Sequence, residues 1–237
     1  MNIRRLKTVK KFVSLLLALC LTLCCTAALA AGNLEVTKET YVATESYGMC
    51  IGYLYAEVTN TGDSNVEFSS GIVEILSESG DVTDTDTVYL TYPNILAPGE
   101  KGYIINSSYV DSDKVSDIAD HALTVVGKTS KEEPTTRYDA TATVESYEQW
   151  GNTCYRMVVT VTNNTSETLY DADVVAAVYD ADGNLLYAGD YTMYNIGVPA
   201  GSSMEVRIDV DSDISAQWLA NSVEPASVEC CCYEEDF

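Results

Sequence analysis

The sequence of 237 residues has little of the chemistry that most catalytic and metal sites use. It contains a single histidine, His121, and 13 basic residues against 36 acidic ones. One histidine leaves a zinc site or a catalytic triad without its usual partners, and no G-x-S-x-G segment is present. The negative charge repels nucleic-acid phosphates and anionic lipid, so neither is expected as a partner. We expect His121 at the exposed surface, no catalytic, cofactor-binding or metal-binding residues, and a protein that is not an enzyme.

Long apolar runs are also scarce, and the one that exists lies in the first 30 residues. A basic start is followed by the apolar run 12–25 and by three small residues at 28–30, which is the layout of a secretory signal peptide. The run is short for a membrane span, which needs about 20 residues. We expect cleavage near Ala30, with lipidation at a leader cysteine as the alternative. The mature chain is expected to be secreted or held at the cell surface, without a membrane span.

Five cysteines follow this leader: Cys50, Cys154, Cys230, Cys231 and Cys232. An odd number leaves at least one thiol free, or paired between molecules, if the others are oxidised. Adjacent residues of a strand point to opposite faces, so the three consecutive cysteines do not converge on one metal ion. A disulfide between Cys154 and one of these three is an option, but the sequence does not define the pairing.

The chain repeats itself after about a hundred residues. Four short segments return in the same order: ESY (45–47 and 145–147), VTN (58–60 and 161–163), NI (94–95 and 195–196) and VDSD (110–113 and 210–213). The spacing changes only where Gly, Asn and Pro mark turns, as expected for two copies of one fold with loops of different length. We therefore expect two domains with separate cores, at residues 34–127 and 138–233, and a polar linker at 128–137.

Both copies have the alternation of apolar and polar residues that is typical of β-strands. In MEVRIDV (204–210) and YRMVVTV (155–161) every second residue is apolar. In LYAEV (54–58) the residues Leu54, Ala56 and Val58 share one face, and Tyr55 and Glu57 lie on the other. The segment DVVAAVYD (173–180) is apolar on both faces, as expected for a central strand.

A different pattern follows each VDSD segment. Apolar residues recur there with helical spacing, so we expect one or two helical turns, capped by Ser112 in the first copy and by Ser212 in the second. A last strand should follow in each copy, at ALTVVGK (122–128) and ASVECCC (226–232). The sequence therefore predicts an all-β protein of two tandem immunoglobulin-like β-sandwich domains, each with a short helical turn before its last strand.

The turns and strands of the second copy also carry a family resemblance. Val161–Asn163 end a strand in a Thr-Asn turn, Ala176–Asp180 close the next strand, Gly183 fits an Asp-Gly hairpin, and Pro199–Gly201 fit a Pro-Gly turn. This order resembles the FxLYD-type domains of bacterial secreted and surface proteins, with Ala in place of Phe and Val in place of Leu in the named motif. The first copy keeps both turns but matches poorly at that motif. The resemblance implies an immunoglobulin-like sandwich at a bacterial cell exterior and no catalytic residues.

Two acidic segments are candidates for cation binding. DADGN (180–184) begins like a calcium loop, and DVTDTDT (81–87) clusters three aspartates. Neither has the ligand spacing and the closing glutamate of an EF-hand. We therefore expect a hairpin turn at the first segment and a solvated loop at the second.

Tyrosine is unusually frequent, with 17 residues against three phenylalanines. Seven tyrosines lie on or near predicted strands and turns: Tyr89, Tyr92, Tyr103, Tyr109, Tyr187, Tyr191 and Tyr194. Tyrosine suits strands, which is the simpler explanation, whereas exposed tyrosines would recognise proteins or sugars. A concave, tyrosine-lined groove between the domains would favour ligand binding, and flat sheets would favour a structural or adhesive role.

The function that follows is a non-catalytic, extracytoplasmic binding or structural (spacer) protein of a bacterial cell exterior, acting through its β-sandwich surfaces. The expected partner is a cell-envelope or extracellular protein or glycan, which the sequence does not identify. The first alternative is a secreted protein that binds a cation or a small ligand, and the second is a secreted enzyme of unfamiliar type.

Overall fold

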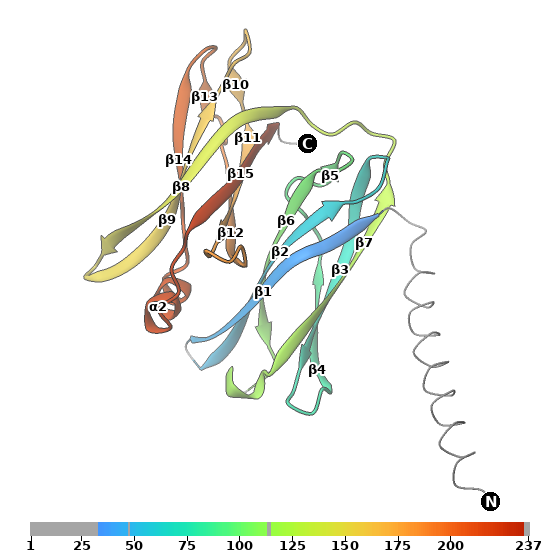
Figure 1. The fold of residues 1–237 in the computed structure, drawn as a ribbon, viewed down its shortest axis with the longest axis vertical. Helices are drawn as coiled ribbons and strands as arrows, with labels where there is room; N and C mark the ends of the chain where they lie inside the picture. Colours follow the sequence, from blue (N-terminus) through green and yellow to red (C-terminus); the bar gives the residue numbers. More distant parts are fainter. Residues whose placement is uncertain (1–32, 47, 113–114, 235–237) are drawn as a thin grey trace, which may run out of the picture.

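The structure, a computed structural model, describes residues 33–46, 48–112 and 115–234 (Figure 1). The predicted signal peptide, residues 1–30, lies outside these ranges. Most described residues belong to antiparallel strands, with one α-helix and one short 3₁₀ helix among them, so the prediction of an all-β protein is confirmed. No helix in the described ranges is long and apolar enough to cross a membrane.

The first half of the chain, residues 33–129, consists of two antiparallel sheets. Its elements are β1 (Leu34–Ser46), β2 (Met49–Asn60), β3 (Val66–Leu76), β4 (Val82–Val88), β5 (Ile95–Leu96), β6 (Lys101–Val110), the 3₁₀ helix η1 (Val115–Asp117) and β7 (Asp120–Thr129). One sheet has the order β1-β2-β6; in the other, β3 pairs with β7 and with β4 and β5. Both sheets contribute to one apolar core, into which β2 places Leu54, Ala56 and Val58, as predicted.

The second half, residues 137–234, consists of a series of six paired strands and a separate two-stranded sheet of β10 and β13. Its elements are β8 (Arg137–Gln149), β9 (Asn152–Thr162), β10 (Leu169–Tyr170), β11 (Ala172–Tyr179), β12 (Leu185–Thr192), β13 (Gly197–Val198), β14 (Ser203–Asp209), α2 (Ser212–Ala220) and β15 (Ser227–Glu234). The strand order is β12-β11-β15-β8-β9-β14, but β15 and β8 pair only through Cys232 with Tyr138 and Tyr233 with Arg137. The alternation predicted for β9 and β14 is confirmed, because Met157, Val159, Val206 and Ile208 are buried.

The repeated VTN segment has the same structural role in both halves. The Asn60 side chain donates to the carbonyls of Ser64 and Leu96, at 2.9 Å each, and the Asn163 side chain donates to those of Glu167 and Val198, at 2.7 Å each. Both asparagines are fully buried. Each one satisfies backbone groups of the turn that follows its strand and of a later short strand, so the repeat preserves a fold-defining turn.

The two halves pack against each other through the sheet β1-β2-β6 and strands β11 and β12 (Figure 1). The face of β2 that carries Tyr55 and Glu57 is buried as well, with 3% and 2% of these residues exposed. The Tyr55 ring lies 4.7 Å from the ring of Tyr187 in the second half. The expectation of separate cores needs correction here, because Tyr55 and Tyr103 join the apolar core of the second half.

Strand β11 is buried on both faces, as predicted for a central strand. One face belongs to the core of the second half, and the first half covers the other. The hydroxyl of Tyr179, at the end of β11, lies 2.6 Å from Oε2 of Glu57 and 3.2 Å from the hydroxyl of Tyr103. The sequence predicts the burial of this strand but not what covers it.

A helical segment precedes the last strand in each half, η1 before β7 and α2 before β15. The predicted cap of α2 is wrong by one residue, since the cap is Asp211 and Ser212 is the first residue of the helix. The Asp211 carboxylate accepts a hydrogen bond of 2.8 Å from the backbone N–H of Asp213. An aspartate caps a helix as well as a serine does, and its charge also favours the helix N-terminus.

The connection between the halves is shorter than the predicted linker 128–137. Strand β7 continues to Thr129 and β8 begins at Arg137, because both ends of the polar stretch pair with neighbouring strands. Arg137 is held against the first half by its bonds to Glu100, with Nε–Oε1 at 2.6 Å and Nη2–Oε2 at 3.1 Å. The connection is therefore residues 130–136, most of which are exposed.

Candidate functional site

A groove of about 320 Å³ lies between the two halves. It is lined by residues of three regions: Leu90, Thr91, Tyr92, Pro93, Asn94 and Ile95 from the first half, Thr135 from the connection, and Asp173, Asp190, Thr192, Tyr194 and Tyr233 from the second half. A hollow of this size at a junction between packed units is a common position for a ligand site.

Strand pairing brings the two carboxylates of the groove together. Asp173 of β11 lies opposite Thr192 of β12, and Asp190 is two residues before Thr192 on the same strand. Opposed residues and residues two apart point to one face of a sheet, so both carboxylates lie on the face toward the first half. The Thr192 hydroxyl donates a bond of 2.6 Å to Oδ1 of Asp173.

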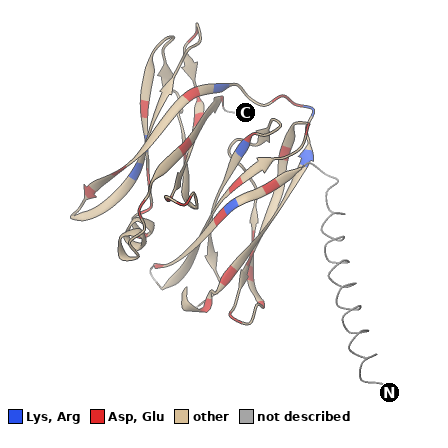
Figure 2. Cartoon of the chain, in the orientation of Figure 1, with Lys and Arg blue, Asp and Glu red and all other residues tan. Residues whose placement is uncertain are grey.

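The charged side chains that line the groove, Asp173 and Asp190, are both acidic. Burial raises the pKa of Asp173, although the hydrogen bond from Thr192 opposes this. Burial and the nearby charge of Asp173 raise the pKa of Asp190. No ion pair to either carboxylate is found within the described ranges. Acidic residues also outnumber basic ones on both halves (Figure 2).

Aromatic, apolar and uncharged polar side chains form the remaining walls. Tyr233 is buried, and the Arg137 guanidinium lies 5.4 Å from the centre of its ring. Tyr92 is partly buried, and its backbone exchanges two hydrogen bonds with Tyr103. Tyr194 and Leu90 are 62% and 53% exposed, so the groove presents apolar surface to solvent.

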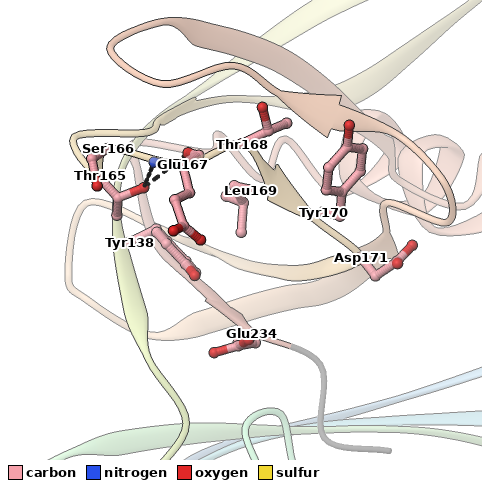
Figure 3. A pocket seen from close by; sticks show the side chains of 9 residues that line it. All are labelled: Tyr138, Thr165, Ser166, Glu167, Thr168, Leu169, Tyr170, Asp171 and Glu234. Atoms are coloured by element: carbon pink, nitrogen blue, oxygen red, sulfur yellow. Dashed lines mark hydrogen bonds between the residues drawn. The ribbon is translucent and has the colours of Figure 1, made fainter.

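Figure 3 shows a second pocket, of about 560 Å³, that lies wholly in the second half. Tyr138 and Glu167 lie on one side of it, and Tyr170 and Asp171 on the other. The Thr165 hydroxyl donates to the backbone carbonyl of Glu167 at 3.0 Å, which closes the turn on itself. The lining is mostly polar, and it includes only one of the two halves, so we consider the groove the better candidate.

The predicted exposure of His121 is wrong. Its side chain is 16% exposed, and its ring stacks on that of Tyr41 with a centroid distance of 5.2 Å. Strand β7, which carries His121, pairs with β3, and this brings the histidine next to β1. The chain has no second histidine, and the groove residues do not include this one.

The predicted loop DVTDTDT is instead strand β4, paired with β3. Its aspartates accept structural hydrogen bonds: Asp84 Oδ2 from the backbone N–H of Asp111 at 2.8 Å, and Asp86 Oδ2 from Nδ2 of Asn106 at 2.7 Å. The predicted hairpin turn at DADGN is confirmed, with Asn184 bonded to the carboxylate of Asp180. The described residues contain no group of three or more side chains that could hold a metal ion.

No disulfide joins Cys154 to the consecutive cysteines of β15, all of which have free thiols. Burial raises the pKa of Cys231 to about 11 and that of Cys232 to about 12. The thiolate is the reactive form of cysteine, so these residues are core positions of low reactivity.

Of the seven tyrosines named from the sequence, Tyr92 is partly buried and lines the groove, Tyr191 is 39% exposed, and the other five divide into two groups. Tyr103 and Tyr187 are buried at the junction, whereas Tyr89, Tyr109 and Tyr194 are 74%, 71% and 62% exposed. Of these three, only Tyr194 lines the groove. Asp173 and Asp190 could not be identified from the sequence, because a carboxylate in a strand gives no signal until the strand pairing is known.

The comparisons with known proteins do not identify this chain. No family model matches it, and no curated protein does. A red sea bream transglutaminase structure is similar over 75% of this chain and 27% of its own, with 11% identity and a TM-score of 0.22. The coconut allergen cocosin is similar over 86% of both chains, with 8% identity and a TM-score of 0.12. Neither value is high enough to support an inference about fold or activity.

Proposed function

We propose that this protein is a non-catalytic binding protein of a bacterial cell exterior that holds a ligand in the groove between its halves. The observation that carries the proposal is the groove itself, which combines Tyr92 of the first half with Tyr194 and Tyr233 of the second. Tyrosines combine apolar area with a polar tip and favour recognition. The lining offers rings, hydroxyls and carboxylates, which hold a ligand by non-covalent contacts.

We also propose a domain type for the two halves. The two halves are two tandem immunoglobulin-like domains of FxLYD type, at residues 33–129 and 137–234, and the predicted leader would direct them outside the cytoplasm. This is supported by the matching turns at Asn60 and Asn163 and by the helical segment before the last strand of each half.

A fixed junction makes the groove suitable for binding. Lys101 of the first half lies 2.8 Å from Glu229 of the second, and Glu57 accepts the hydrogen bond from Tyr179 described above. A site that is already formed before the ligand arrives avoids part of the ordering cost of binding. The junction therefore supports a ligand groove better than a flexible spacer.

The proposal is tested by screening the ¹⁵N-labelled chain from residue 31 onward against a library of cationic, neutral and anionic small molecules. We expect at least one class to shift the amide signals of groove residues in a saturable way, and Tyr194→Ala to weaken that binding. Tyr109→Ala is the matched control, because it removes an equally exposed tyrosine outside the groove. If no compound shifts the groove signals, or both variants behave alike, the groove is not a ligand site and a structural role is favoured.

A further inference from the structure

We propose that the groove binds an organic cation, an ammonium group carried on an apolar stem, and this inference rests on the binding function proposed above. The carboxylates are the first reason. Asp173 and Asp190 share one sheet face in the groove, and no ion pair to either is found among the described residues. Asp173 is partly buried and Asp190 is exposed, and the charge of Asp173 disfavours the charged form of Asp190. A bound cation would relieve this repulsion.

The rings are the second reason. Tyr92 and Tyr233 line the groove together with both carboxylates, and burial and the charges of Asp173 and Asp190 raise the pKa values of both phenols. An ammonium group near the carboxylates would therefore also lie near aromatic faces, which attract cations. The Arg137 guanidinium already lies over the Tyr233 ring, so a ligand cation would contact the ring of Tyr92 or the other face of Tyr233.

Exposed apolar side chains of the groove are the reason for expecting an apolar stem on the ligand. Leu90 and Tyr194 line the groove and are more than half exposed. Methyl or methylene groups next to an ammonium would cover these two side chains while the charge lies at the carboxylates. A fully polar ligand would leave them in contact with water.

Other ligand classes fit this lining less well. A calcium ion needs six to eight oxygen ligands, and a magnesium ion needs a near-ideal octahedron, whereas the groove supplies two carboxylates. A neutral sugar would leave both carboxylates without a counter-charge. An anion would be repelled by Asp173 and Asp190.

Choline and its neutral isostere 3,3-dimethyl-1-butanol are the decisive pair of probes, because they differ in charge but hardly in shape. A peptide with blocked ends and a single lysine is the third probe. Comparison of this peptide with choline shows whether the ammonium group belongs to a free small molecule or to a protein side chain. Binding is measured by ¹⁵N chemical shifts at physiological salt, on the whole chain from residue 31 onward. We expect saturable shifts in the groove with choline, with the lysine peptide or with both, and none with the isostere.

The variant Asp173→Asn/Asp190→Asn should weaken this binding by about tenfold, because each ion pair near the surface contributes only modestly. Glu35→Gln/Glu78→Gln is the control, since it removes the same charge at two exposed positions outside the groove and should leave the affinity unchanged. Circular dichroism melting curves establish that both variants fold.

Four outcomes overturn the inference. If the isostere binds as well as choline, or if both double variants weaken binding equally, charge recognition in the groove is absent. If neutral or anionic compounds bind in the groove and no ammonium compound does, the inference fails while the proposed function stands. If nothing binds there at all, both fail.

Discussion

The hydroxyl of Tyr179 in the second half donates a hydrogen bond of 2.6 Å to Oε2 of Glu57 in the first. Glu57 is 2% exposed; it also accepts a bond of 2.7 Å from Thr37 and lies 3.3 Å from Nζ of Lys101. Burial alone would raise the pKa of this carboxyl, but the bonds from Tyr179 and Thr37 and the charge of Lys101 outweigh it, so the pKa is lowered. A buried charge with this many partners fixes the two halves in one arrangement.

Removal of the Tyr179 hydroxyl tests this junction. Tyr179→Phe leaves the Glu57 carboxylate one donor short in a buried position, so the free energy of unfolding should fall by about 1–3 kcal/mol. Urea denaturation measures the change. Tyr109→Phe, which removes an exposed hydroxyl, is the control and should have little effect. Equal stability of Tyr179→Phe and the unchanged protein would show that the bond does not hold the junction.

The lowered pKa of Glu57 also predicts a dependence on pH. A carboxyl whose pKa is lower in the folded state contributes stability above its unfolded value of about 4.3, and this contribution is lost as the pH falls through the folded pKa. The stability difference between the unchanged protein and Glu57→Gln should therefore be largest near neutral pH and shrink below about pH 4. Denaturation curves across this range measure it. A difference that grows toward acid pH would mean that the Glu57 pKa is raised instead.

Because Asn60 and Asn163 have the same structural role, we expect their substitution by alanine to lower the stability of the protein by similar amounts. Asn60→Ala and Asn163→Ala each leave backbone carbonyls unpaired, which costs about 1–3 kcal/mol for each buried group. Thermal melting should show losses of similar size for both variants and almost none for Asn152→Ala at an exposed position. A loss confined to one of the two variants would argue against a shared turn.

Limited proteolysis examines the connection between the halves. Lys131 is exposed and lies in the connection 130–136, whereas Arg137 is bonded to Glu100 and to the carbonyl of Ile95. Trypsin should therefore cut after Lys131 well before Arg137, because proteases require locally mobile chain. The two fragments should elute together in gel filtration, since the junction joins them. Early cleavage at Arg137, or fragments that separate without denaturant, would contradict the packed junction.

Much of the fold could be predicted from alternation, because strands with one buried face show it directly. Val206 and Ile208 of β14 are examples. Alternation did not predict the contact between the two halves. In the sequence Tyr55 and Glu57 resemble the exposed face of a strand, but they are buried by residues more than a hundred positions away. Strand β4 was missed for another reason, since its aspartates obscured the β-forming Thr and Val residues between them.

The candidate site was less predictable than the fold. Asp173 and Asp190 come together only through the pairing of β11 and β12, and Leu90 and Tyr92 reach them only through the packing of the halves. The excess of tyrosine was the one sequence signal, and it did not distinguish the groove tyrosines Tyr92 and Tyr194 from the other tyrosines of the chain.

The central claim is that one ligand is held by both halves at once, and a choline titration of the ¹⁵N-labelled chain from residue 31 onward tests it most directly. The account predicts that the amide signals of Leu90 and Tyr92 and those of Asp190 and Tyr194 shift together, along saturation curves with a single dissociation constant. Shifts confined to one half, or shifts spread over the acidic surface that do not saturate and disappear with added salt, would contradict it.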